Sequence, residues 1–147
     1  MLCFFSVCYW YSCFGSNIPE AFKNEEAYGK VREENSGKCG DNLDWVFDAE
    51  TSTLSITGNG NMTCCGSVNT PWSQFQNVTK TVEIEGGVTS IDSLAFRLFR
   101  ELSSVIIPDS VTSIGNYSFY NCTSLQSLVI PESVKSLGGY CFFGCSS

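Results

Sequence analysis

The stretch SSVIIPDSVTSIGNYSFYNCTSL at residues 103–125 is followed directly by QSLVIPESVKSLGGYCFFGCSS at residues 126–147. The second stretch reproduces the first with a period of 23 residues, so that Pro108 recurs as Pro131. Residues 81–102 align at the same spacing and give a third unit. Four columns run through the units: Val88, Val111 and Val134; Ile91, Ile114 and Leu137; Phe96, Phe119 and Phe142; and Phe99, Cys122 and Cys145. A fixed period of this length predicts a solenoid, in which a unit gains a core only by stacking on its neighbours.

The apolar pattern of the middle unit predicts two short extended pieces followed by a turn. Its inward side chains are expected to be Val105, Ile107, Val111, Ile114, Phe119, Cys122 and Leu125. The last three are spaced by three, which favours a single helical turn or a 3₁₀ stretch. The fold class predicted from this pattern is mostly β with short helical turns.

The segment before the repeats, residues 37–78, lacks the period and has the features of a β-hairpin. Residues 45–48 and 53–57 are expected to be two short strands, because Leu54 and Ile56 alternate with hydroxyl-bearing residues. Residues 49–52 have the length and polarity of a hairpin loop. We expect this β-rich segment to be an N-terminal cap that covers the apolar end of the first unit, with the repeats filling residues 79–147.

The first 36 residues differ from the rest of the chain. Residues 2–14 carry no charge, but they are too few for a bilayer-spanning helix, which needs roughly 20 residues. Their length favours a secretory signal peptide over residues 1–16, although no Lys or Arg precedes the apolar run. The alternatives are a non-native start and an apolar strand. Residues 17–36 are predicted to be a charged linker, either solvated or partly helical.

The composition excludes several classes of function. The net charge is −7, and the eight basic residues are scattered, so neither nucleic acid nor an anionic membrane surface is an expected partner. The chain contains no histidine, which removes the commonest general base and metal ligand and excludes His-dependent nucleophile systems. No phosphate loop or pair of catalytic carboxylates is present. We therefore predict no catalytic residue, no cofactor, no metal and no small-molecule substrate.

The nine cysteines are unusual for a chain of 147 residues. Removal of a signal peptide leaves six, which suits an oxidising compartment. Cys39, Cys64 and Cys65 are the candidate disulfide cysteines, with Cys39 as the partner of one of the other two. A redox enzyme that uses the adjacent pair is an alternative, but the pair lacks the C-x-x-C spacing of such enzymes. The cysteines near the C-terminus are expected to be buried small hydrophobic residues, namely Cys122, Cys141 and Cys145.

Four Asn-x-Ser/Thr sequences are present. Asn61 and Asn77 are the candidate glycosylation sites, provided that the chain is secreted. Asn116 and Asn121 recur at turns between units, where Asn is favoured for backbone reasons. The hydroxyl of Ser118, which completes the Asn116 sequence, is expected to face inward.

The general form of the repeat unit is Leu-x-x-Leu-x-Ile-Pro-x-Ser-Val-x-x-Ile-Gly-x-x-x-Phe-x-x-Cys. It resembles the 23-residue leucine-rich repeat of the BspA-like surface proteins. The middle unit carries this pattern through Ile107, Pro108, Ser110, Val111, Ile114, Gly115, Phe119, Cys122 and Leu125. The third unit carries it through Ile130, Pro131, Ser133, Val134, Leu137, Gly138, Phe142 and Cys145. The first unit departs from it, with Glu85, Asp92 and Phe99 in the proline, glycine and cysteine columns.

The resemblance extends over residues 37–147 and implies a right-handed leucine-rich-repeat solenoid. Such proteins are surface antigens of bacteria and some parasitic protists, and they act by adhesion or host-protein binding without catalysis. The resemblance therefore implies an extracellular or cell-surface place for this chain, or a cytoplasmic one if residues 1–16 are not a signal peptide. Because the third unit is incomplete, we expect a truncated copy or part of a larger repeat protein.

The expected contact surface is the outward side of the repeat strands. Its residues are Thr81, Glu83, Ser104, Ile106, Ser127 and Val129. The apolar residues in this polar strip fit a contact surface for a protein ligand, which is either a host or matrix protein or further repeats. The β propensity of Ile and Val is the simpler explanation for their presence.

Overall fold

Three antiparallel strands precede the repeats, and the alternation of apolar and polar residues determines which side of each strand is buried. In the computed structural model, which describes residues 35–66 and 69–145, these strands are β1 (Ser36–Gly40), β2 (Leu43–Asp48) and β3 (Thr53–Gly58). The predicted hairpin is confirmed, because β2 and β3 pair from Leu43↔Gly58 to Asp48↔Thr53. The carboxylate of Asp48 closes the turn by accepting the N–H of Glu50 at 2.8 Å. The sequence did not predict β1. The predicted signal peptide and almost all of the charged linker lie outside the described residues.

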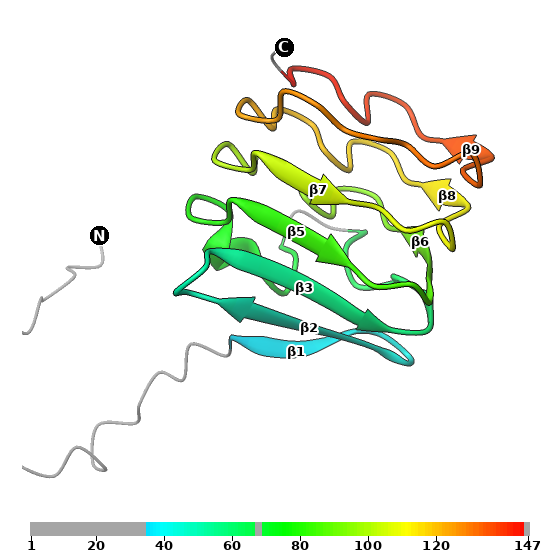
Figure 1. The fold of residues 1–147 in the computed structure, drawn as a ribbon, viewed down its shortest axis with the longest axis horizontal. Coiled ribbons are helices and arrows are strands. Elements are labelled where there is room, and N and C mark those ends of the chain that lie inside the picture. The colour runs from blue at the N-terminus through cyan, green and yellow to red at the C-terminus, as the bar shows by residue number, and fades with distance from the viewer. Residues whose placement is uncertain (1–34, 67–68, 146–147) are drawn as a thin grey trace, which may run out of the picture. The chain divides into compact units, whose positions relative to one another are not determined.

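The first strands of the first two repeat units extend the same sheet. β5 (Thr81–Ile84) pairs in parallel with β3, and β7 (Ser104–Ile106) pairs in parallel with β5. The register Thr81↔Ser104 equals the sequence period, so equivalent residues of successive units lie side by side. The strand order is therefore β1-β2-β3-β5-β7 (Figure 1).

A second, parallel sheet runs along the other side of the stack. It has the order β4-β6-β8-β9 and consists of β4 (Gly60–Asn61), β6 (Val88–Ile91), β8 (Ser113–Ile114) and β9 (Ser136–Leu137). Its register, Ser90↔Ser113↔Ser136, again equals the period. The predicted mostly-β fold is confirmed, and the only helical segment in the described residues is the short 3₁₀ helix η2 (Ser73–Phe75).

The return from the second sheet is a run of tight turns. The predicted helical stretch from Phe119 to Leu125 is present only as i→i+3 bonds, such as the N–H of Cys122 to the carbonyl of Phe119 at 3.3 Å. Asn121 has φ 56°, in the left-handed region, which interrupts a right-handed helix. Two columns share this conformation in every unit: Leu94, Tyr117 and Tyr140, and Leu98, Asn121 and Gly144.

The core between the sheets contains a stack of aromatic rings. Phe96, Phe119 and Phe142 lie one above another, with centroids 5.2 and 5.5 Å apart. Trp72, from the segment before the repeats, continues the stack below Phe96 at 5.7 Å, and its indole N–H donates to the carbonyl of Ala95 at 2.8 Å. The inward positions predicted for the middle unit are confirmed, and Ser118 is fully buried. In the third unit, Leu137 of the apolar column is exposed.

One departure of the first unit, Asp92, occurs where the unit meets the preceding segment. One carboxylate oxygen of Asp92 accepts the N–H of Cys65 at 2.9 Å, and the other accepts the N–H of Ser93 at 2.7 Å. In later units this column is Gly115 and Gly138, whose backbone packs directly on the unit below. The aspartate therefore belongs to the junction between the N-terminal sheet segment and the repeats.

Candidate functional site

Four of the six predicted contact residues lie on the outer side of the first sheet. Thr81 pairs with Ser104 and Glu83 pairs with Ile106, so four of the six form two rows across β5 and β7. The side chain of Ile106 is 55% exposed. In the described residues the sheet ends at β7, so Ser127 and Val129 lie beyond its last strand, and Val129 is 81% exposed. The structure thus pairs four of these residues and leaves two outside the sheet.

A second exposed surface, which the sequence reasoning missed, consists of aromatic side chains on the turns. Tyr117 stacks on Tyr140 with centroids 5.3 Å apart, and Tyr120 stacks on Phe143 at 5.5 Å. Tyr140 is 62% exposed and Phe143 57%. The guanidinium of Arg97 lies 5.9 Å from the centre of the Tyr120 ring, within the range of a cation–π contact. The sequence contains a signal for this surface, because Tyr117 and Tyr140, and likewise Tyr120 and Phe143, are 23 residues apart.

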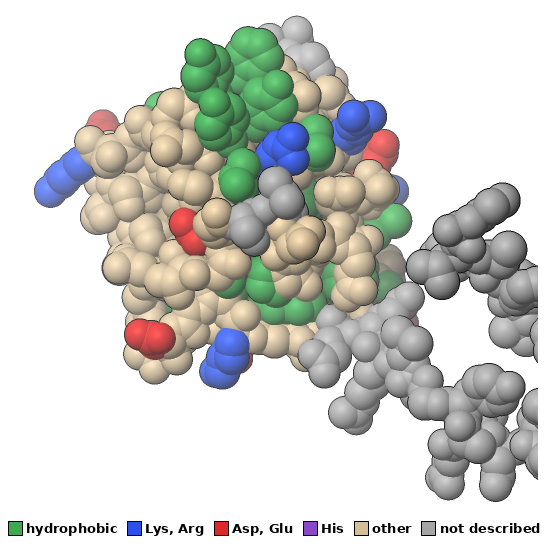
Figure 2. Space-filling model, turned by 180° about the vertical axis from the view of Figure 1, so that it is seen from behind, with side chains coloured by type: hydrophobic (Ala, Val, Ile, Leu, Met, Phe, Trp, Pro, Cys, Tyr) green, Lys and Arg blue, Asp and Glu red, His purple; other side chains and the backbone are tan. Residues whose placement is uncertain are grey.

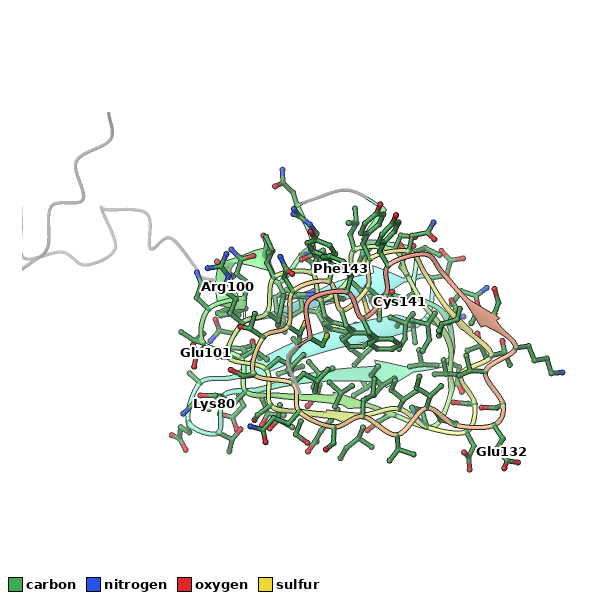
Figure 3. All side chains as sticks on the ribbon, turned by 90° about the horizontal axis from the view of Figure 1, so that it is seen from above. Lys80, Arg100, Glu101, Glu132, Cys141 and Phe143 are labelled. Carbon is green, nitrogen blue, oxygen red and sulfur yellow. The ribbon has the colours of Figure 1, made fainter. Side chains whose placement is uncertain are left out.

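This aromatic surface and the strand face lie on different sides of the molecule. Figure 2, seen from behind, shows hydrophobic side chains gathered at one end of the stack with Lys or Arg side chains beside them. In Figure 3, Phe143 lies away from Lys80 and Glu132, which flank the strand face. The two surfaces can therefore be altered independently in an experiment.

A shallow hollow of about 330 Å³ opens along the second sheet. Its lining includes the column Ser90, Ser113 and Ser136 together with Asp92. Both carboxylate oxygens of Asp92 already accept backbone N–H groups. The hollow thus offers hydroxyl groups without a free acid or base, an arrangement that does not support acid–base catalysis.

The three candidate disulfide cysteines come together in the structure as free thiols. The Sγ atoms of Cys64 and Cys65 are 2.6 Å apart. The thiol of Cys39 is buried and forms a hydrogen bond with Cys64. Both effects hold the pKa of Cys39 well above its ordinary value, the hydrogen bond more than the burial. A catalytic redox thiol needs the opposite shift, because the thiolate is the nucleophile. The hydrogen bond with Cys39 favours the Cys64 thiolate, but the hydrogen bond with Cys65 and burial raise the pKa of Cys64 above its ordinary value, which is the wrong direction for the nucleophile of a redox enzyme.

The repeat-column cysteines donate to carbonyl oxygens of the unit below. Cys122 Sγ lies 3.2 Å from the carbonyl of Phe96, and Cys145 Sγ lies 3.1 Å from that of Phe119. Cys141, which is outside that column, donates within its own unit, with Sγ 2.9 Å from the carbonyl oxygen of Gly138. Cys122 and Cys141 are buried, as predicted, and Cys145 is half-buried. They act as small hydrophobic residues with one donor each.

Burial raises the pKa of Cys122 to about 12 from its ordinary value of 9.0. Because the folded-state value is the higher one, the stabilisation is complete below pH 9 and is lost as the pH rises towards 12. We expect the free energy of unfolding to fall by about 1.4 kcal/mol between pH 8 and pH 10 from this thiol alone. Urea titrations at the two pH values measure the fall. In Cys122→Ser, which keeps the donor but does not ionise, the fall should be smaller by that amount, and an equal fall in both proteins would contradict the assignment.

The candidate glycosylation sites are both on the surface. Asn61 and Asn77 have exposed side chains, and Asn61 Oδ1 accepts the hydroxyl of Thr89 at 2.7 Å. Asn116 Oδ1 accepts the N–H of Gly139 at 2.7 Å, and Ser118 in its sequence is buried. Asn61 and Asn77 therefore remain the accessible candidates.

The described residues, 35–66 and 69–145, contain neither a metal-binding cluster nor a membrane-spanning helix. No group of three or more His, Cys, Asp or Glu side chains in this part has the arrangement needed to hold a metal ion. No helix there is both long and apolar enough to cross a membrane.

Comparison with known proteins gives a consistent result. Residues 71–147 match a family model described as a BspA type leucine rich repeat region, in 6 copies. A leucine-rich repeat protein from Eubacterium ventriosum has a similar structure, with a TM-score of 0.68 and 30% identity over 75% of this chain and 29% of that one. A leucine-rich repeat protein from Bacteroides ovatus is 25% identical over 72% of this chain and 32% of that one, with a TM-score of 0.47. No curated protein matches the chain. This chain thus spans about a third or less of the length of these two solved relatives.

Proposed function

Because this chain belongs to the BspA-type leucine-rich repeat family, we propose that it is a non-enzymatic protein-binding module on or outside the cell. Its repeats form a right-handed solenoid, and residues 37–78 are the N-terminal cap of that solenoid. Stacked repeats present extended surfaces to ligands, which supports binding over catalysis. A host or matrix protein is the proposed ligand.

The observation that carries the proposal is the outward row on the first sheet. Ile106 is directly paired with Glu83, and polar Thr81 and Ser104 flank them. An apolar centre within a polar rim is the usual anatomy of a protein-binding surface. Val129 is equivalent to Ile106 in the next unit and extends the apolar strip. The proposed contact face therefore includes Thr81, Glu83, Ser104, Ile106, Ser127 and Val129.

We expect the purified chain to be retained on at least one of a panel of immobilised extracellular-matrix and host-surface proteins. Replacing both Ile106 and Val129 with Glu should weaken retention at least about tenfold, since it puts two charges into the apolar centre of the contact. Surface plasmon resonance measures the change. Phe143→Ala is the matched control, because it removes an exposed apolar side chain from the other side of the molecule.

The outcomes of this experiment separate the proposals. If Phe143→Ala weakens retention and the Ile106/Val129 variant does not, the strand face is not the contact face. If no protein retains the chain but a longer multi-repeat relative is retained, the chain is instead a structural segment of a larger repeat protein. The exposed apolar side chains of the third unit support this alternative, because a further unit with the same columns would cover Leu137, Tyr140 and Phe143.

A further inference from the structure

Three thiols gather where the N-terminal sheet segment meets the first repeat unit. Cys39 lies on β1, and Cys64 and Cys65 lie in the loop that follows β4. The thiol of Cys64 is a hydrogen-bond partner of both Cys39 and Cys65. The backbone holds this arrangement, because the N–H of Thr63 donates to the carbonyl of Cys39 at 2.9 Å. Cys64 is therefore the central thiol of the three.

Chain geometry distinguishes the two pairings open to Cys64. Consecutive Cα atoms are about 3.80 Å apart across a trans peptide, whereas disulfides usually join Cα atoms about 4.4–6.8 Å apart. The described residues contain no cis peptide bond, so a bond between Cys64 and Cys65 requires distortion of a planar peptide. Cys39 and Cys64 lie on separate hydrogen-bonded segments and are free of that restriction. We propose that Cys39 and Cys64 form a disulfide bond and that Cys65 remains a thiol.

The bond forms by thiol–disulfide exchange with a small disulfide such as oxidised glutathione. Cys64 is half-buried while the other two thiols are buried, so Cys64 is the accessible thiol. Its thiolate attacks one glutathione sulfur, which forms a mixed disulfide and releases the first glutathione thiolate. The Cys39 thiolate then attacks Sγ of Cys64 and releases the second. The protein loses two electrons and two protons, and two reduced glutathione molecules carry them away.

The surroundings of the thiols determine when the exchange is fast. The hydrogen bond with Cys64, burial and Asp44 raise the pKa of Cys39, and Lys38 lowers it by less. The hydrogen bond with Cys39 favours the Cys64 thiolate, but the contact with Cys65 and burial raise the pKa of Cys64 above its ordinary value. Exchange in the folded chain is therefore slow at neutral pH, and the bond forms most readily while the chain folds.

The bond ties together three parts of the molecule. It links the edge strand β1 to the loop after β4, and the next residue in that loop, Cys65, donates its N–H to Asp92 of the first repeat unit. Crosslinking restricts the unfolded chain, so the bond should raise the midpoint of thermal unfolding by at least about 5 °C. The Cys39→Ser variant should show no difference between oxidised and reduced samples.

The test is to refold the full chain at pH 8.5 in reduced and oxidised glutathione, alkylate the remaining thiols, and digest with a glutamate-specific protease. Cleavage after Glu34, Glu50 and Glu83 puts Cys39 in peptide 35–50 and both Cys64 and Cys65 in peptide 51–83. Peptide 1–20 carries Cys3, Cys8 and Cys13 separately. We expect a crosslinked pair of peptides 35–50 and 51–83, with fragmentation that assigns the bond to Cys64 and leaves Cys65 alkylated.

Two variants complete the test. The crosslinked pair should persist in Cys65→Ser and disappear in Cys64→Ser. A bond within peptide 51–83, alkylation of all three thiols, or a crosslink that survives in Cys64→Ser would each overturn the proposal. The assignment in the wild-type chain decides the result even if a variant does not fold.

Discussion

Phe119→Ala should lower the free energy of unfolding by about 3–5 kcal/mol, the usual cost of removing a large ring from a protein core. Phe119 is fully buried and lies between Phe96 and Phe142 in the stack of rings that runs through the units. The space left by the ring cannot collapse easily, because the strands on both sides of it are fixed by ladder hydrogen bonds. Urea denaturation followed by circular dichroism measures the loss. If the variant no longer unfolds cooperatively, the substitution has removed the packed core altogether, which is a larger loss of the same kind.

Phe143→Ala separates burial from ring stacking in this experiment. Phe143 stacks on Tyr120 at 5.5 Å and 12°, nearly the geometry of Phe119 on Phe142 at 5.5 Å and 11°, but it is 57% exposed. We expect this control to lose less than about 1 kcal/mol, because an exposed pair of rings gains little from burial. Equal losses in the two variants would mean that stacking, and not burial, stabilises the stack.

The periodicity predicted which side chains of the middle unit form the core, because that unit has a neighbouring unit on both sides. Val111, Ile114 and Phe119 are buried where the columns placed them. The contacts at the junction with the N-terminal segment were harder to predict, because the junction occurs once and does not repeat with the 23-residue period. Asp92 looked like a worn glycine, although its carboxylate accepts two backbone N–H groups there. A single sequence does not reveal such a contact, because Cys65 and Asp92 are 27 residues apart and share no motif.

Of the two candidate surfaces, the sequence predicted one and missed the other. The sequence predicted the outward row on β5 and β7 because strand alternation assigns a side to each residue. It did not predict the exposed aromatic surface, half of which consists of Tyr117 and Tyr140 with left-handed backbone. Non-glycine residues seldom adopt that conformation. The column consists of Leu94, Tyr117 and Tyr140, and none of these residue types indicates a left-handed backbone. The 23-residue period contains this column, but the period does not show which way its side chains point.

Gly115→Ala should lower the free energy of unfolding by about 2–3 kcal/mol, a typical cost of overpacking. A Cβ at Gly115 would overlap the backbone nitrogen of Ser93 and lie 2.8 Å from the carbonyl carbon of Asp92. Both atoms belong to the main chain of the unit below, so no change of side-chain rotamer relieves the contact. The units would have to separate at the point where the N–H of Gly115 donates to Ile91 at 2.9 Å.

Gly139→Ala is the matched control for this prediction, because the residue follows Gly138 of the same column. A Cβ there would meet only the side chain of Asn116 at 3.7 Å, and the φ angle is outside the left-handed region. We expect no loss, or a gain of about 0.4–1 kcal/mol, since alanine restricts the unfolded chain more than glycine does. Urea titrations of the two variants measure the contrast. If Gly115→Ala were as stable as Gly139→Ala, the units would be less closely packed than the structure has them, and the glycine column would owe its presence to something other than close approach.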